Sequence, residues 1–306
     1  MFEEVAKSCG LFDGTDSETV IKNICALDEK FQSGDLVGIY NYMLSVSKDP
    51  DVLMNIIRLS DRFRDKSTIP YLIDLLLMKE ETEEQKEKFI NARSMCAKAI
   101  ANYRDRSTVT PLLYCLNNKD EHYRVRLACA DALGKIGDRY AVAPLIEVVK
   151  DEDEKSVYLR ESAASALGML GDMRAIEPLV NILETKQGLL NKFTFLKERV
   201  IEALSKLRLD GNDRVFHALK SSLTDENAQV RINAIEALME SEHPKAVDTI
   251  KECLSDNDEE VRKNALIALY NLVGRDILDE VISLPIYPES LKEEAKYMIE
   301  EYEEDE

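Results

Sequence analysis

The sequence predicts an all-α protein, a right-handed α-solenoid built from about eight stacked helical hairpins. The main observation is a repeated segment: residues 125–146 read VRLACADALGKIGDRYAVAPLI, and residues 159–180 read LRESAASALGMLGDMRAIEPLV. Self-similarity at a period of about 34 residues is typical of a chain that stacks one unit many times. The composition agrees, because the 306 residues include only 8 Pro, 11 Gly and no Trp.

Each repeat predicts two helices joined by a tight turn. In the fourth repeat, Val125, Cys129, Leu133 and Ile136 recur at helical spacing on one face. The pair Gly137–Asp138 then interrupts the pattern, since Gly ends helices in the left-handed conformation and Asp caps the start of the next one. A second apolar segment follows and carries a proline early in the helix, where a missing N–H is tolerated. A single hairpin cannot cover its apolar faces, whereas a stack of hairpins can.

Eight such repeats align along the chain on the pattern R-x-x-A-x-x-A-L. The leucine position is occupied by Leu27, Leu59, Ile100, Leu133, Leu167, Leu204, Leu238 and Leu269. The basic position is occupied, from the third repeat onward, by Arg93, Arg126, Arg160, Lys197, Arg231 and Arg262. We expect one repeat domain over residues 1–306, with a degenerate unit at 1–47, divergent repeats at 48–119, regular repeats at 120–285, and a capping helix with an acidic tail at 286–306.

Two longer spacings interrupt the period. The step from Leu59 to Ile100 is 41 residues, with the surplus in the charged stretch Lys79–Lys88. The step from Leu167 to Leu204 is 37 residues, with the surplus around Thr185–Asn191. Insertions in solenoids form loops, often on the binding side, although a solvated helix extension is the alternative for the charged stretch. At the C-terminus we predict a capping helix near Ser290–Tyr302 and a frayed acidic end at Glu303–Glu306.

The formal net charge of -19 narrows the classes of partner and compartment. An acidic chain matches a phosphate backbone poorly, so a nucleic-acid partner is not expected. The N-terminus, Met1–Phe12, lacks the basic and apolar regions of a secretory signal, and no apolar run approaches a membrane span. We therefore expect a cytoplasmic protein with no membrane partner, in which the six cysteines are thiols.

The pattern V-R-x-x-A-x-x-A-L-G-x-I-G-D-x-R-A-V-x-P-L-I resembles HEAT repeats, and specifically the short HEAT-like repeats named after phycobilisome lyases. The resemblance covers most of the chain and is strongest over residues 120–185. It implies the α-solenoid fold. It leaves the function open, because the family includes scaffolds, chaperone-like lyase subunits, hydroxylases and some DNA glycosylases.

No residues stand out with catalytic, cofactor-binding or metal-binding spacing. The histidines His122, His217 and His243 lie far apart, and no H-x-x-x-H or His-Glu pair occurs. The HEAT-like deoxyhypusine hydroxylases rely on repeated His-Glu dyads for a di-iron centre, so that activity is not expected of this chain. The chain also lacks C-x-x-C, a P-loop, G-x-G-x-x-G and G-x-S-x-G. The prediction is a chain that is not an enzyme and uses no cofactor or metal.

The repeat alignment gives the cysteines and the basic positions structural roles. Cys96 and Cys129 take a position held elsewhere by alanine, and Cys115 and Cys253 take one held elsewhere by valine or isoleucine. All four are predicted to be small core residues. The basic positions are expected to pair with acids in the turns, with Asp138 and Asp172 as candidates. An anion-binding stripe is the alternative.

Function is then expected on the helix that opens with V-R, which lines the concave side in the solenoids that this chain resembles. Positions just before the basic residue, and five and nine residues after it, should point into that groove. They are Tyr123, Arg124, Asp131, Lys135, Tyr158, Ser165, Met169, Phe195, Glu202 and Lys206. Three of them, Tyr123, Tyr158 and Phe195, would form an aromatic row that anchors a partner. The alternative is that these rings cap the hairpin ends and pack on neighbours.

The leading hypothesis is a non-catalytic scaffold or adaptor that binds a protein partner in the concave groove. The resemblance to lyase proteins gives an alternative, a chaperone-like or lyase-type subunit that assists the attachment of a bilin cofactor. A lower alternative is a HEAT-like DNA glycosylase, against which the acidic composition weighs.

Overall fold

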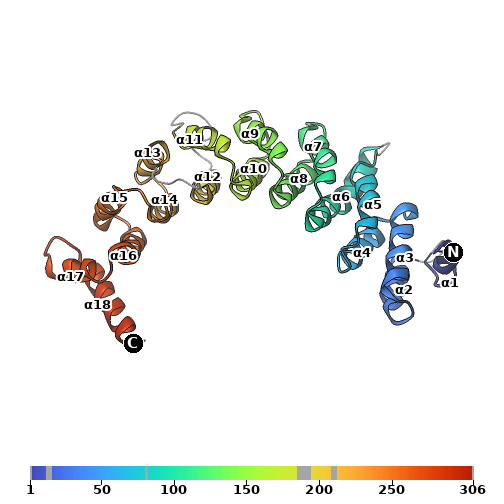
Figure 1. Cartoon of the computed structure of the whole chain (residues 1–306), viewed down its shortest axis with the longest axis horizontal. Coiled ribbons are helices and arrows are strands. Elements are labelled where there is room, and N and C mark those ends of the chain that lie inside the picture. The colour runs from blue at the N-terminus through green and yellow to red at the C-terminus, as the bar shows by residue number, and fades with distance from the viewer. Residues whose placement is uncertain (1, 12–15, 80–81, 185–193, 208–211, 305–306) are drawn as a thin grey trace. The chain divides into compact units, whose positions relative to one another are not determined.

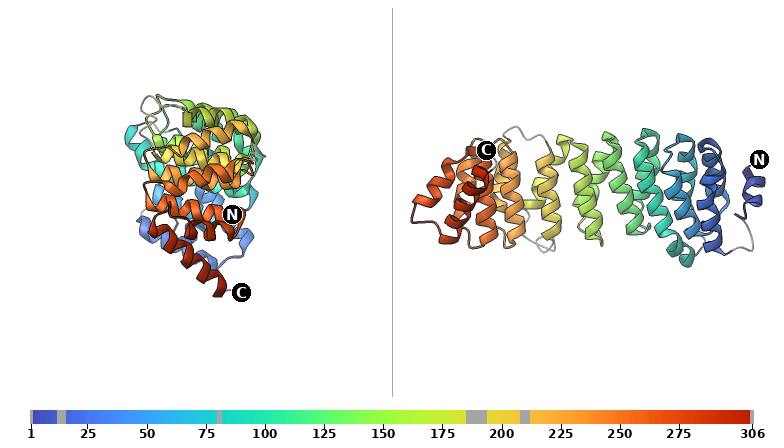
Figure 2. Two further views of the ribbon diagram at one scale, coloured as in Figure 1. Left: turned by 90° about the vertical axis from the view of Figure 1, so that its left-hand side faces the viewer. Right: turned by 90° about the horizontal axis from the view of Figure 1, so that it is seen from below.

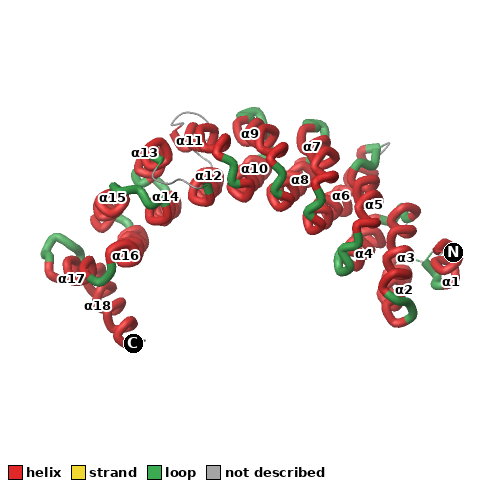
Figure 3. Tube along the Cα trace, in the orientation of Figure 1, coloured by secondary structure: helices red, strands yellow, loops and turns green. Residues whose placement is uncertain are grey.

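The computed structural model describes residues 2–11, 16–79, 82–184, 194–207 and 212–304. Over these ranges the chain folds into helices and loops and has no strand, which confirms the all-α class (Figure 3). Every described helix is too short or too polar to cross a bilayer. The chain separates into two compact units, residues 1–149 and 150–306. The single domain expected from the repeats stays a prediction.

The first unit is a succession of antiparallel helical hairpins. Its helices are α1 (Phe2–Ser8), α2 (Ser17–Cys25), α3 (Ser33–Val46), α4 (Pro50–Ser60), α5 (Ile69–Leu76), α6 (Glu83–Tyr103), α7 (Val109–Asn117), α8 (Tyr123–Ile136) and α9 (Val142–Lys150). The helices α4, α6 and α8 pack against one another, and α5 and α7 pack on them from one side (Figure 1). We call α4, α6 and α8 the B row of this unit, and α5, α7 and α9 its A row.

The second unit repeats the same arrangement. Its helices are α10 (Val157–Leu170), α11 (Ile176–Glu184), α12 (Thr194–Lys206), α13 (Asp213–Ser222), α14 (Ala228–Glu240), α15 (Ala246–Glu252), α16 (Glu259–Val273), α17 (Asp276–Ser283) and α18 (Glu289–Glu304). The helices α10, α12, α14 and α16 pack side by side as its B row, while α11, α13, α15 and α17 form its A row (Figure 1). The right-hand view of Figure 2 shows helices of this unit lying side by side, coloured from yellow-green to red. In both units, the helices that carry a basic repeat position belong to the B row.

The turns inside two regular hairpins, α8–α9 and α10–α11, follow the chemistry that the sequence predicts. Gly137 ends α8 with a φ of 78°, in the left-handed region that glycine occupies without strain. The carboxylate of Asp138 then accepts a hydrogen bond of 2.9 Å from the backbone N–H of Tyr140, which starts a short 3-10 turn before α9. Asp172 caps the equivalent turn before α11. The predicted helix–Gly-Asp–helix unit is confirmed.

Small residues let the B-row helices approach closely. Ala163 and Ala166 of α10 are fully buried, as is Ala203 of α12 to within 1%. A Cβ added to Gly168 of α10 would lie 2.8 Å from the Cα of Ala203, closer than two carbon atoms can pack. Small residues are therefore needed where α10 crosses α12.

The predicted capping helix is confirmed as α18, which buries Leu291, Ala295 and Met298 against the last hairpin. The helix runs to Glu304, and the frayed end expected at Glu303–Glu306 stays a prediction. The charged insertion becomes an extension of α6, because the hydroxyl of Thr82 caps that helix and residues 83–88 are exposed. Residues 80–81 and the whole of the second predicted insertion, Thr185–Asn191, lie outside the described ranges.

Candidate functional site

Each B-row helix leaves one stripe of side chains uncovered on the side away from the A row, and we call this side the B-row face. On α10 the stripe contains Tyr158, Ser165 and Met169, which are exposed or half-buried. These residues recur about every three to four positions, the spacing of one helix face. The three positions that the sequence predicted for this repeat therefore lie on one face of α10.

The same spacing on α12 brings out Phe195, Glu202 and Lys206, with buried residues between them. Glu202 is held in place by two bases of its own helix. It accepts hydrogen bonds of 2.6 Å from Arg199 and 2.7 Å from Lys206. The predicted positions on α12 thus hold an aromatic ring near the start of the helix and, further along, charged side chains that pair with one another.

The two rings of this face are far more exposed than aromatic side chains usually are. Tyr158 is 62% exposed and Phe195 is 68% exposed. Each is the second residue of its helix, and the close approach of Gly168 to Ala203 places α10 beside α12. Solvent-exposed rings on neighbouring helices favour the interpretation that they are available to a partner. Binding itself stays a prediction.

Tyr123 belongs to the first unit, and its contacts are local. The ring is half-buried, and its centroid lies 4.7 Å from that of His122, which caps α8 by accepting from the N–H of Arg124. The guanidinium carbon of Arg124 lies 6.0 Å from the Tyr123 ring centroid. These contacts match the alternative in which the ring packs at the end of its own hairpin. A row of three aromatic rings across both units therefore stays a prediction.

A hollow of about 350 Å³ opens on the B-row face between α12 and α14. Its lining includes the predicted Glu202 and Lys206, together with Glu236 and Glu240 of α14. Ile201 and Ala237, which are 1% and 2% exposed, form an apolar floor. Carboxylates thus surround a small apolar patch in the second unit.

Two further carboxylates lie near the exposed rings. Burial raises the pKa of Glu161 on α10 and that of Glu198 on α12. The negative charge of Glu198 raises the pKa of Glu161 further, while Arg199 lowers it. Glu198 thus lies close enough to Glu161 to affect it electrostatically, and both carboxylates are partly removed from water.

A second hollow, of about 490 Å³, opens on the B-row face of the first unit between α4, α6 and α8. The predicted residues Asp131 and Lys135 line it, together with Arg58 and Lys98. Asp61 also lines it and accepts two hydrogen bonds of 3.0 Å from the side chain of Asn102. Basic side chains outnumber acidic ones in this hollow.

The sequence prediction missed Lys98, Glu236 and Glu240, although the signal was available. Lys98 lies five residues after the basic repeat position of α6, and Glu236 and Glu240 lie five and nine residues after that of α14. The same spacing rule, applied to every repeat, identifies all three. Arg58 breaks the rule by one residue, because it belongs to a degenerate repeat.

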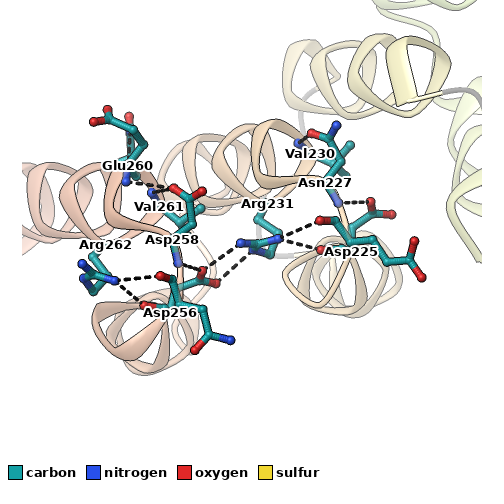
Figure 4. Close-up of polar contacts among 12 residues, drawn as sticks. Asp225, Asn227, Val230, Arg231, Asp256, Asp258, Glu260, Val261 and Arg262 are labelled. Atoms are coloured by element: carbon teal, nitrogen blue, oxygen red, sulfur yellow. Dashed lines mark hydrogen bonds and ion pairs between the residues drawn. The ribbon is translucent and has the colours of Figure 1, made fainter.

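The basic repeat positions are structural, as predicted. Arg231 of α14 donates bidentate hydrogen bonds of 3.0 and 2.8 Å to Asp256 and another of 2.8 Å to the backbone oxygen of Asp225 (Figure 4). Arg262 of α16 binds the backbone oxygens of Asp256 and Asn257 in the same way (Figure 4). Arg93 pairs with Glu121, and Lys197 pairs with Asp225. Each base therefore ties its helix to the turn between consecutive hairpins.

The prediction that Asp138 and Asp172 pair with the basic repeat residues is wrong. Both cap the 3-10 turns that follow α8 and α10. Arg126 lies near the start of α8, whereas Asp138 follows the end of that helix, 12 positions further along the chain. That is about 18 Å, which no arginine side chain spans. The acids that do pair lie in the turn before the next B-row helix.

The cysteine prediction is confirmed for the repeat positions. Cys96 and Cys129 are fully buried, while Cys115 and Cys253 are 2% and 7% exposed. Burial raises the pKa of the Cys253 thiol to about 11, so the thiolate is scarce at neutral pH. Within the described ranges, no group of three or more His, Cys, Asp or Glu side chains is placed to share a metal ion.

The family model of HEAT repeats matches residues 84–158, 119–192, 187–270 and 216–284, which together span more than half of the chain. No protein of curated function matches the sequence significantly. Similar solved structures include the CpcE–CpcF complex of phycocyanin lyase from Nostoc sp. PCC7120, at 23% identity over 76% of this chain and 87% of that chain, with a TM-score of 0.47. Human deoxyhypusine hydroxylase in complex with glycerol is 17% identical over 88% of this chain and 96% of that chain, with a TM-score of 0.35.

The solved structure of Kap95p with RanGDP is also similar, at 13% identity and a TM-score of 0.58, over 95% of this chain and 46% of that chain. At this identity the likeness concerns the fold alone. It agrees with hairpins that stack through shared repeat positions, as both units show. The chain belongs to the HEAT-repeat family.

Proposed function

We propose that this protein is a non-catalytic scaffold that binds a protein partner on the B-row face. The observation that carries the proposal is the pair of exposed rings, Tyr158 at 62% and Phe195 at 68% exposure, on neighbouring helices of the second unit. Rings that are exposed to this degree stabilise their own chain less than buried rings do, because the hydrophobic contribution scales with the area removed from water. Tyrosine and phenylalanine lose little rotamer freedom on binding and are common interface anchors.

The carboxylates beside the rings give this face polar groups as well as apolar area. Interfaces combine a small apolar centre with a polar surround, and a few residues contribute most of the affinity. In the second unit, Tyr158 and Phe195 supply the apolar part, and Glu161, Glu198 and Glu202 supply the polar part. The shared repeat positions meanwhile hold the helices in place.

The test is affinity capture from native lysate with the full chain as bait, followed by mass spectrometry. The double variant Tyr158→Ala/Phe195→Ala should reduce capture of the main partner at least about tenfold, since aromatic anchors contribute about 2 kcal/mol or more each. Its melting curve should match that of the unchanged protein. Tyr140→Ala is the matched control, because Tyr140 is 83% exposed but lies in the turn before α9.

Two outcomes contradict the proposal. Capture that is unchanged in the double variant removes the rings from the binding surface. A large fall in melting temperature with unchanged capture assigns them a packing role instead. An absorbance change on mixing with a linear tetrapyrrole favours the lyase-type alternative, and DNA binding that weakens steeply with salt favours the glycosylase alternative.

We also propose that the protein works in a reducing, cytoplasmic compartment. All the described cysteines are free thiols, and four of them occupy core positions of the repeat. Thiol trapping in intact cells, followed by denaturation and mass measurement, should find every cysteine reduced. A disulfide in the native protein contradicts this assignment.

A further inference from the structure

Charge is unevenly distributed on the B-row face of the second unit. The acids on α10, α12 and α14 are Glu161, Glu198, Glu202, Glu236 and Glu240, and the bases are Arg199 and Lys206. Both bases bind the same acid, Glu202. Over the described ranges, the other four carboxylates form no ion pair. The face therefore presents negative charge that the chain itself does not neutralise.

The hollow between α12 and α14 has the shape and polarity to accept one long cationic side chain. Its lining carries the carboxylates of Glu236, Glu240 and Glu202, and among the described residues Lys206 is bonded to Glu202 alone. Its floor is the apolar surface of Ile201 and Ala237. Arginine and lysine side chains have an apolar stem and a charged head. A stem of this kind fits the floor, and the head reaches the carboxylates of the lining.

The exposed rings lie next to the other unpaired acids. Tyr158 precedes Glu161 by three residues on α10, and Phe195 precedes Glu198 by three residues on α12, so each ring shares a helix face with a carboxylate. Burial raises the pKa of both glutamates, and the nearby charge of Arg199, which is bonded to Glu202, only partly offsets this rise. A cation that docks here gains both a carboxylate and an aromatic face.

We propose that the partner segment bound on this face is basic: a stretch of protein chain in which arginine or lysine alternates with apolar residues. One basic side chain occupies the hollow lined by Glu236 and Glu240, and another lies against Tyr158 and Phe195 beside Glu161 and Glu198. The inference rests on the proposed scaffold function and specifies the chemistry of its partner. Charge complementarity with a face rich in unpaired carboxylates is what selects this occupant.

The probe is a phage-displayed library of random peptides of about 12 residues, which reach ~40 Å when extended and so cross three helices spaced about 10 Å apart. The full chain is the target. Selected peptides should be enriched in Arg and Lys next to Leu, Ile, Phe or Tyr. The most enriched peptide, synthesised with a fluorophore, should bind more weakly as salt rises, because exposed charges are screened.

The variant Glu236→Lys/Glu240→Lys should weaken binding of that peptide at least about tenfold. The control Asp248→Lys/Glu252→Lys changes the net charge equally on α15 of the A row and should change the affinity less than about twofold. Both variants should keep the melting temperature, because all four side chains are exposed. Equal weakening by the two variants would show only a long-range effect of net charge and would overturn the assignment to this face.

Different failures separate the inference from the proposed function. Enrichment of acidic or uncharged peptides that still lose binding in Tyr158→Ala/Phe195→Ala overturns the basic partner and leaves the scaffold standing. If basic peptides are enriched but bind both the ring variant and the glutamate variant as tightly as the unchanged protein, the proposed location of the site is overturned. No enriched peptide, together with no captured protein, counts against both.

Discussion

The B-row faces of the two units differ in charge although the helices beneath them are built alike. In the first unit, three bases and two acids line a hollow of about 490 Å³: Arg58, Lys98, Lys135, Asp61 and Asp131. In the second unit, three acids and one base line a hollow of about 350 Å³: Glu202, Glu236, Glu240 and Lys206. Lys135 and Glu240 even occupy the same position of the repeat, nine residues after the basic position. Buried positions thus preserve the stack, while uncovered positions vary in chemistry.

The largest expected effect on stability comes from substituting a residue at the basic position that the repeats share. Arg231→Ala removes a bidentate partner from Asp256, whose side chain is only 15% exposed, and leaves two turn carbonyls without their donor. The free energy of unfolding should fall by about 3 kcal/mol, as it does when one partner of a buried ion pair is removed. Urea denaturation followed by circular dichroism measures this loss.

Arg199→Ala is the matched control, because Arg199 lies on the uncovered face of α12 and its side chain is 52% exposed. Its loss should cost about 0.5 kcal/mol or less, since exposed ion pairs contribute little. Equal costs for the two arginines would contradict the division between buried and uncovered positions.

The second effect tests the close approach of α10 and α12. Gly168→Ala places a Cβ 2.8 Å from the Cα of Ala203, so the helices must move apart. We expect a loss of about 1–3 kcal/mol in urea denaturation, the usual cost of overpacking. Gly34→Ala serves as the control: its Cβ meets no atom within 4 Å, and it should leave stability unchanged or raise it slightly.

Both of these predictions concern positions that recur in the repeat, and recurring positions are what the sequence alone could predict. Repeat spacing predicted the hairpins, the Gly-Asp turns, the buried cysteines and the capping helix, because burial recurs at fixed positions. It did not identify Asp256 or Glu121 as partners of the bases, since that requires knowing which helix end faces which turn. Nor did it show that Tyr123 packs locally while Tyr158 and Phe195 are exposed, because all three occupy the same region of the repeat.

A smaller effect on stability should follow from exchanging charges in the first unit. Lys98→Glu/Lys135→Glu makes its hollow acidic like that of the second unit. The free energy of unfolding should change by about 0.5 kcal/mol or less, because both side chains are exposed. Binding of the enriched basic peptide should become stronger or stay the same. A substantial loss of stability would show that these lysines are structural. Weaker peptide binding would show that the peptide binds the first unit, which contradicts the proposed site on the second.

The smallest effect concerns the glutamate whose pKa burial raises. A carboxyl with a raised pKa in the folded state favours protonation, so it destabilises the fold at pH 7 and this penalty disappears as the pH falls through the raised pKa. Glu161→Gln should therefore raise stability at pH 7 by about 0.5 kcal/mol or less, since the group is partly solvated. The gain should vanish in thermal melts at pH 4. Glu240→Gln, on an exposed position, should give no gain at either pH.

Hydroxyl-radical footprinting of the protein with its captured partner tests most directly whether function lies on the uncovered B-row face. The method reports the solvent exposure of individual aromatic and methionine side chains. We predict that partner binding protects Tyr158, Met169 and Phe195 from oxidation, while Tyr140 and Met173, which lie in the turns before A-row helices, stay as reactive as in the free protein. Protection of Tyr140 and Met173 with no change at Tyr158 and Phe195 would contradict the account.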